Sequence, residues 1–125
     1  MGEVPLSVGQ VLALDAEYRQ AAEEGRLKKI APKENNPTGE AWLPIMYRRL
    51  DDSRVTLLYS NTDLAHRLGK THDWVVLYHK PLGGRGRETQ CTIITEWHEG
   101  PLRDRRVVRG REEETLEYYR HEGAL

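Results

Sequence analysis

The sequence predicts an α+β domain, in which an antiparallel sheet of about four strands carries an N-terminal helix, one short inserted helix and a C-terminal helix. Two observations favour this fold class. Apolar residues recur at helical spacing near both ends of the chain, whereas β-branched and aromatic residues gather between residues 41 and 97. The length of 125 residues suits a single domain, residues 1–125, which can bury about two-thirds of its unfolded surface.

The first helix is predicted to begin at Ser7, with Gln10 three residues later as its capping-box partner. Gly25 is a stop signal, so the helical pattern covers residues 7–24. Asp15 could restart the helix after a break, so the pattern is compatible with one helix or with two shorter pieces. Residues 26–40 contain two prolines, two asparagines and a glycine, which predict a loop.

A β-hairpin is predicted next, from residues 41–50 and 55–59 around a polar turn. Pro44 cannot donate a hydrogen bond, so it places the first of these strands at an edge or a bulge. A short helix follows, because three consecutive N-cap candidates precede an apolar stripe and Gly69 ends it. The stripe consists of Leu64, Ala65 and Leu68.

Residues 73–79 are predicted to form a central strand, because apolar side chains fall on both of its faces. A glycine-rich loop at 81–88 joins it to a strand at 89–97, in an antiparallel hairpin whose paired positions sum to about 169. A brief extension at 105–108 and a final helix at 111–121 complete the chain.

Composition and charge exclude some classes of protein and indicate where charged partners could bind. The single Cys91 excludes an internal disulfide framework and any multi-cysteine zinc motif. The sequence shows neither a signal peptide nor an apolar run near the ~20 residues of a membrane span, so we expect a cytoplasmic protein with no membrane partner. Residues 26–111 hold 17 Lys or Arg against 10 Asp or Glu, whereas both ends are acidic. The basic middle could meet an anionic partner or be covered by the acidic terminal helices.

Three runs of sequence carry a resemblance: GEAWLP, SNTDLAHRLGKTHDWVVLYH and QCTIITE…GPLRDRRVVRGRE. Together they resemble the C-terminal region of a bacterial family whose N-terminal part carries helix-hairpin-helix repeats, similar to the non-catalytic front end of family X DNA polymerases. The resemblance spans about Leu14 to Tyr119. It implies a domain associated with a DNA-repair-type module, with DNA or a helix-hairpin-helix protein as partner. The glycine turn by which such repeats hold DNA is absent from this sequence, so no DNA-binding residue carries over.

The best candidates for chemistry are His72, Asp73, Glu96 and His98. Pairing of strands 73–79 and 89–97 would bring them together at the strand ends, where they could hold a divalent metal or run acid–base catalysis. We favour a hydrogen-bonded polar cluster instead, because neither HxxxH nor HExxH spacing is present. No metal or cofactor is therefore predicted, and the enzyme hypothesis, a small metal-dependent hydrolase, is the second choice.

An arginine-rich central surface is the predicted binding site for nucleic acid. Guanidinium groups favour bidentate phosphate contacts, and alternate residues of an extended segment after residue 102 would project to one side. The alternative is a solvated surface paired with the acidic residues 112–114. The predicted phosphate contacts are Lys80, Arg85, Arg87, Arg103, Arg105, Arg106 and Arg109.

Three hypotheses therefore stand. The first is a non-enzymatic nucleic-acid-associated domain with salt-sensitive binding that is largely independent of sequence. The second is the hydrolase, and the third is a protein-interaction module anchored by Tyr118 and Tyr119 of the last helix. Among the tryptophans, which we expect mainly in the core, Trp97 is the best candidate for stacking on a base. Cys91 is expected to be a buried, inert thiol.

Overall fold

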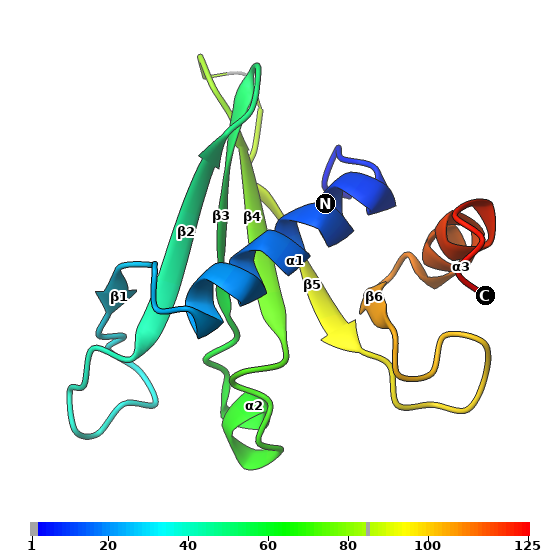
Figure 1. Cartoon of the computed structure of the whole chain (residues 1–125). Helices are drawn as coiled ribbons and strands as arrows, with labels where there is room; N and C mark the ends of the chain where they lie inside the picture. Colours follow the sequence, from blue (N-terminus) through cyan, green and yellow to red (C-terminus); the bar gives the residue numbers. More distant parts are fainter. Residues whose placement is uncertain (1–2, 85) are drawn as a thin grey trace.

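The computed structural model describes residues 3–84 and 86–125, and six antiparallel strands form its sheet in sequence order, β1 to β6. Helix α1 lies across one face of the sheet, α2 lies at one end between β3 and β4, and α3 lies beside β6 (Figure 1). The elements are α1 Val8–Glu23, β1 Lys29–Ile30, β2 Leu43–Arg49, β3 Ser53–Tyr59, α2 Asp63–Arg67, β4 Val75–Pro81, β5 Thr89–Thr95, β6 Arg106–Val108 and α3 Glu112–His121.

The α+β class and the antiparallel sheet are confirmed, but the sheet has six strands rather than about four. The two underestimated strands are the short edge strands. β1 lies inside the predicted loop 26–40 and pairs Lys29 with Pro44, and β6 pairs Val108 with Ile93. Strands of two or three residues are too short for an alternating pattern, so their partners and not their own sequences define them.

Helix α1 is one continuous helix, so the alternative of two pieces is wrong. Its capping box is present, since the Gln10 amide donates to Ser7 Oγ and the Ser7 amide donates to Gln10 Oε1. Asp15 does not break the helix because its carboxylate accepts hydrogen bonds from two arginine side chains and leaves the backbone undisturbed.

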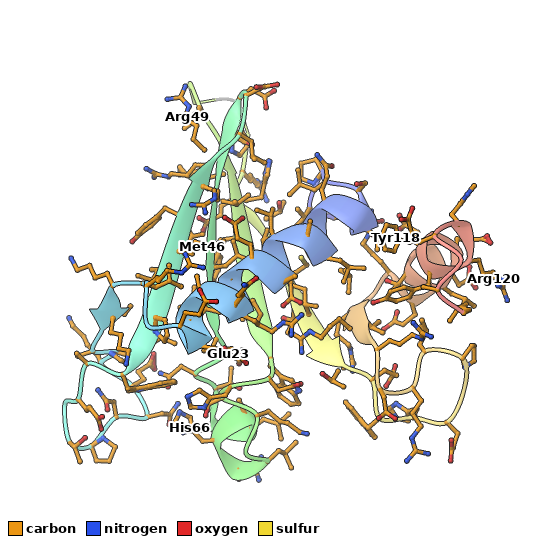
Figure 2. The ribbon with its side chains drawn as sticks, in the orientation of Figure 1. Glu23, Met46, Arg49, His66, Tyr118 and Arg120 are labelled. Carbon is orange, nitrogen blue, oxygen red and sulfur yellow. The ribbon has the colours of Figure 1, made fainter. Side chains whose placement is uncertain are left out.

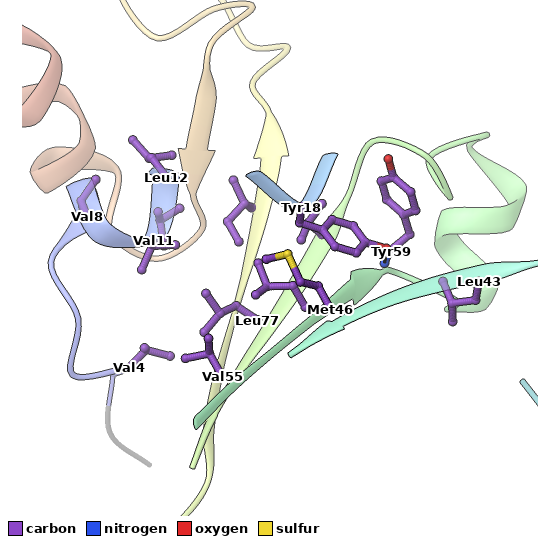
Figure 3. Close-up of a cluster of buried hydrophobic side chains, with 14 residues drawn as sticks. Val4, Val8, Val11, Leu12, Tyr18, Leu43, Met46, Val55, Tyr59 and Leu77 are labelled. Atoms are coloured by element: carbon purple, nitrogen blue, oxygen red, sulfur yellow. Dashed lines mark hydrogen bonds between the residues drawn. The ribbon is translucent and has the colours of Figure 1, made fainter. Parts of the chain in front are cut away.

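The core lies between α1 and the sheet (Figure 3). Odd-numbered side chains of β3 and β4, such as Val55, Leu57 and Leu77, point towards α1 and are fully buried. Tyr18 of α1 lies among them, and its hydroxyl joins two strands: it donates to the Pro44 carbonyl at 2.7 Å and accepts from the Tyr59 amide at 2.9 Å. These bonds fix the helix against β2 and β3.

The opposite face of the sheet consists of the even-numbered side chains of β3, β4 and β5 together with Ile45, Tyr47 and Arg49 of β2. We call this surface the open face, because α1 is the helix that lies across the sheet among the described elements and it covers the other side (Figure 1). The prediction for α2 needs a correction here. Only Ala65 of its apolar stripe is buried, whereas Leu64 and Leu68 are exposed.

Across residues 3–84 and 86–125, no helix is long and apolar enough to cross a bilayer.

Candidate functional site

The predicted cluster of His72, Asp73, Glu96 and His98 does not assemble. Strands β4 and β5 pair in a register whose positions sum to 168, as in Val75 with Ile93, one less than predicted. This register brings Asp73 to Thr95, which donates its backbone amide at 3.1 Å and its hydroxyl at 2.7 Å to the carboxylate. Asp73 is therefore satisfied by its own strand neighbour.

Of the other three members, Glu96 and His98 pair with each other, and His72 lies elsewhere. Glu96 Oε1 accepts from the amides of Trp97 and His98 and contacts His98 Nδ1 at 2.8 Å. The His98 hydrogen bond is the main reason that the pKa of the Glu96 carboxyl lies below its ordinary value. His72 instead packs against Tyr59, with ring centroids 5.3 Å apart. In the described part of the chain, no group of three or more His, Cys, Asp or Glu residues is placed to hold a metal ion.

Arg106 is not a surface residue, which corrects its predicted phosphate-binding role. Its guanidinium is largely buried and donates to both carboxylate oxygens of Asp15, at 3.1 and 2.8 Å. The same group reaches Asp73 at 3.2 Å and the hydroxyl of Thr95 at 3.1 Å. Arg106 of β6 thus ties α1 to β5 and to the segment that precedes β4. We call Asp15, Arg19, Asp73, Thr95 and Arg106 the buried ion network.

The remaining arginines of this segment do not share one side, because only residues 106–108 are extended. Arg103 lies in a turn and pairs with Glu99, and Asp104 has a positive φ of 66°. Arg105 lies over the ring of Tyr119, 5.2 Å from its centroid. Arg109 lies 3.9 Å from the Glu112 carboxylate, Arg87 is exposed, and Arg85 falls outside the described residues.

The structure instead assembles a basic row that the sequence reasoning missed. Arg49 of β2 pairs with Arg54 of β3, and Arg54 pairs with Lys80 of β4. All three side chains are exposed, and within residues 3–84 and 86–125 none of them forms an ion pair. Figure 2 shows Arg49 at the end of the sheet opposite to α2. Like charges directly opposite one another destabilise a sheet. A bound anion would reduce the repulsion within this row.

Neighbouring charges are separated between the two sides of the sheet. Arg48, one residue before the row, points to the α1 side and pairs with Glu17. Asp51 and Asp52 of the β2–β3 turn line a cavity on that same side. Glu88 would lie opposite Lys80 if the β4–β5 register continued by one residue, although the two form no ion pair in the structure described. The open face therefore carries the three cations of the basic row, and Glu88 is the carboxylate that the continued register places beside Lys80.

Aromatic side chains lie directly beside the basic row. Thr56 has Tyr47 on one neighbouring strand and Tyr78 on the other, so two phenol rings flank it on the open face. Tyr47 is 57% exposed and Tyr78 is half-buried. Strands lie about 4.8 Å apart, which separates these rings by roughly 10 Å. Flat rings at such spacing can each take one unpaired base.

An apolar groove continues the open face towards α2. It has a volume of about 530 Å³ and is lined by Trp74 and Ile94 of the sheet side and by Trp97 from the loop after β5. Trp97 is 51% exposed and stacks on His98 with ring centroids 4.6 Å apart. The prediction of stacking by Trp97 stays a prediction, but its exposure agrees with it. Leu64, Leu68, His98 and Arg109 complete the rim of the groove.

Helix α3 does not offer free aromatic anchors. The Tyr119 hydroxyl donates to the Arg106 carbonyl at 2.7 Å, and Tyr118 packs so closely on α1 that a Cβ on Gly9 would lie 2.9 Å from its ring. Both tyrosines are half-buried and hold α3 to the rest of the domain. Docking of a partner protein through these tyrosines stays a prediction, and it would use only the exposed part of each ring.

Cys91 is expected to react slowly in the folded protein. Cys91 is half-buried rather than fully buried, and its side chain lies opposite Leu77 on the core side. This partial burial raises the pKa of the thiol to about 11, whereas a free thiol has a pKa of about 8.5. At pH 8 we expect alkylation by iodoacetamide, followed by mass spectrometry, to be about a hundredfold slower than in the unfolded chain, because the thiolate is the nucleophile. Equal alkylation rates in the folded and the unfolded chain would contradict the assignment.

The raised pKa of the Cys91 thiol also means that the stability of the folded protein falls as pH rises from about 8.5 through 11.

No family model, curated protein or solved structure matches the chain.

Proposed function

We propose that this domain binds single-stranded nucleic acid on the open face of its sheet. The observation that carries the proposal is the row of Arg49, Arg54 and Lys80, three exposed cations set side by side on neighbouring strands without partners among the described residues. Phosphate groups would relieve this repulsion. The proposed partner is still nucleic acid, as in the prediction from sequence, but the proposed contacts differ. Lys80 is the one residue that belongs both to the predicted contacts and to the basic row.

The aromatic side chains of the same face support single strands over duplexes. A base in a duplex has no free face, whereas the bases of a single strand can stack on Tyr47, Tyr78 and Trp97. The sheet then acts in two parts, with cations at one end holding the backbone and rings along the face holding bases. Neither part reads base edges, so we expect binding that depends weakly on sequence.

Neutralising the basic row should weaken binding and reduce its salt dependence. We expect the triple variant Arg49→Gln, Arg54→Gln and Lys80→Gln to lower the slope of log affinity against log salt concentration by about 2, because each single-strand phosphate contact contributes about 0.7. The measurement is fluorescence anisotropy with a labelled oligonucleotide of about 12 nucleotides, within the site sizes of single-strand-binding folds, at several salt concentrations.

A matched variant controls for net charge. Arg26→Gln, Lys33→Gln and Arg120→Gln remove the same three charges from exposed positions elsewhere on the protein. This control should leave the slope of the unmodified protein unchanged. Equal slopes for the two triple variants would assign binding to overall charge and overturn the proposal. Absence of binding at low salt, or tighter binding of a duplex of the same length, would also overturn it.

Stacking makes a separate prediction. Tyr47→Ala and Trp97→Ala should each weaken single-strand binding by about fivefold to 150-fold, which corresponds to the ~1–3 kcal/mol of one stacked base. Both side chains are more than half exposed, so neither change should disturb the fold. The salt slope should stay the same in both variants, because no phosphate contact is lost. A changed slope with unchanged affinity at low salt would contradict this division of roles.

A further inference from the structure

A second cavity lies on the other side of the sheet from the open face. It has a volume of about 470 Å³, in the range of small-molecule sites, and lies between the N-terminal segment, the β2–β3 turn and the end of β4. Apolar side chains form much of its wall, including Leu6, Leu50 and Leu82. Its separation from the open face makes it independent of the proposed nucleic-acid binding.

One side chain of this cavity lacks a partner. His79 is only 5% exposed, and its Nδ1 atom is buried with no hydrogen-bond partner in residues 3–84 and 86–125. Thr89 lies directly opposite His79 in the β4–β5 register, outside the cavity lining, and its Oγ1 atom is also buried without a partner among the described residues. Buried polar groups in folded proteins are nearly always hydrogen-bonded. Two such groups on adjacent strands therefore indicate that this end of the core accommodates a further polar molecule.

The charged residues around the cavity indicate whether the bound molecule is positively or negatively charged. Asp51 and Asp52 line it, and neither carboxylate forms an ion pair in the part of the chain that the structure describes. Its described lining contains no lysine or arginine. Carboxylates accept hydrogen bonds and do not donate them when ionised, so they favour a donor that carries positive charge. A metal ion fits poorly, because no described group of three potential ligands converges.

We propose that the cavity binds a small organic cation, namely an amine or guanidine on a short apolar body. The cationic group would meet Asp51 and Asp52, the apolar body would lie against Leu6, Leu50 and Leu82, and His79 would gain the hydrogen-bond partner that it lacks. We call this site the cation pocket.

The wall formed by the N-terminal segment is fixed rather than loose. Arg111, the residue that precedes α3, donates from Nη1 to the Leu6 carbonyl at 2.8 Å and lies 3.3 Å from the Glu3 carboxylate. Its hydrogen bonds to Glu114 raise the pKa of Arg111 above its ordinary value, and the pKa of the Glu114 carboxyl is lowered by the same contact. The cation pocket is thus preformed, which reduces the entropy that binding would cost.

The test uses butylamine and butylguanidine as probes, with butanol and butanoate as the neutral and anionic controls. Two-dimensional ¹H–¹³C NMR of the His79 ring follows each titration of the full chain. We expect saturable shifts of His79 with the two cations and none with the controls. In the double variant Asp51→Asn and Asp52→Asn the dissociation constants should rise at least about tenfold, because hydrogen bonds to charged groups are lost.

The double variant is well suited to this purpose because both residues are exposed in a turn, so their change should not unfold the protein. Asp63→Asn on α2 removes one exposed carboxylate away from the cavity and should leave binding unchanged. Failure of both cations to shift His79 at millimolar concentration would overturn the proposal. So would equal binding of butanol, which would show an apolar cavity without charge selection, or unchanged affinity in the double variant.

Discussion

Replacing Asp15 with alanine is expected to lower the free energy of unfolding by about 3–5 kcal/mol, the cost of removing one partner from a buried ion pair. The Asp15 side chain is fully buried and accepts hydrogen bonds from Arg19 at 3.0 Å and from Arg106 at 3.1 and 2.8 Å. Without it, the largely buried Arg106 guanidinium would keep only Asp73 as a charged partner within residues 3–84 and 86–125. Urea denaturation followed by circular dichroism measures the loss.

Two further variants separate burial from charge. Glu17→Ala removes an exposed carboxylate of the same helix, which pairs with Arg48 at the surface, and should cost no more than about 1 kcal/mol. The double variant Asp15→Leu and Arg106→Met removes both charged partners. It should recover most of the stability lost in Asp15→Ala, because apolar replacement of a whole buried pair is often neutral. If Asp15→Ala lowered the free energy of unfolding no more than Glu17→Ala does, the buried ion network would be dispensable for stability.

The sequence predicts the elements of this fold better than their contacts. Three local signals are confirmed by the structure. Ser7 and Gln10 form the predicted capping box, and Gly25 follows the end of the helix with a positive φ of 71°. The strand with apolar residues on both faces is the central strand β4. The buried ion network could not be predicted, because Asp15 and Arg106 are 91 positions apart and a charged residue carries no local sign that it will be buried. The sequence alone therefore predicts Arg106 on the surface with its arginine neighbours.

The open face shows the same limit at shorter range. Arg49 and Arg54 lie on either side of a predicted turn, so the hairpin register alone would have placed them opposite each other. Lys80 joins them only because β3 and β4 pair across the inserted helix α2, and no local pattern fixes that register. The cation pocket was beyond prediction for a related reason. It combines the N-terminal segment, one turn and one strand end. The observation that points to it is the missing hydrogen-bond partner of His79 Nδ1, which only the described three-dimensional structure shows.

Replacing Tyr18 with phenylalanine is expected to cost about 2–4 kcal/mol, although it removes a single oxygen atom. That oxygen serves two buried backbone groups at once, the Pro44 carbonyl at 2.7 Å and the Tyr59 amide at 2.9 Å. Each backbone group left without a partner in the core costs about 1–3 kcal/mol. Tyr119→Phe is the matched control, since it removes one hydrogen bond to the Arg106 carbonyl from a half-buried ring and should cost about 1 kcal/mol.

The pH dependence of stability distinguishes the hydroxyl of Tyr18 from the packing of its ring. Burial raises the pKa of the Tyr18 phenol well above its ordinary value of 10.0. Its contribution to stability is therefore complete below pH 10 and is lost as pH rises further, because the unfolded chain releases this proton first. Phenylalanine has no proton to release, so Tyr18→Phe should lose less stability than the unmodified protein above pH 10. Parallel curves for the two proteins in urea denaturation at pH 9 to 11 would show that the hydroxyl is not held in the buried position described.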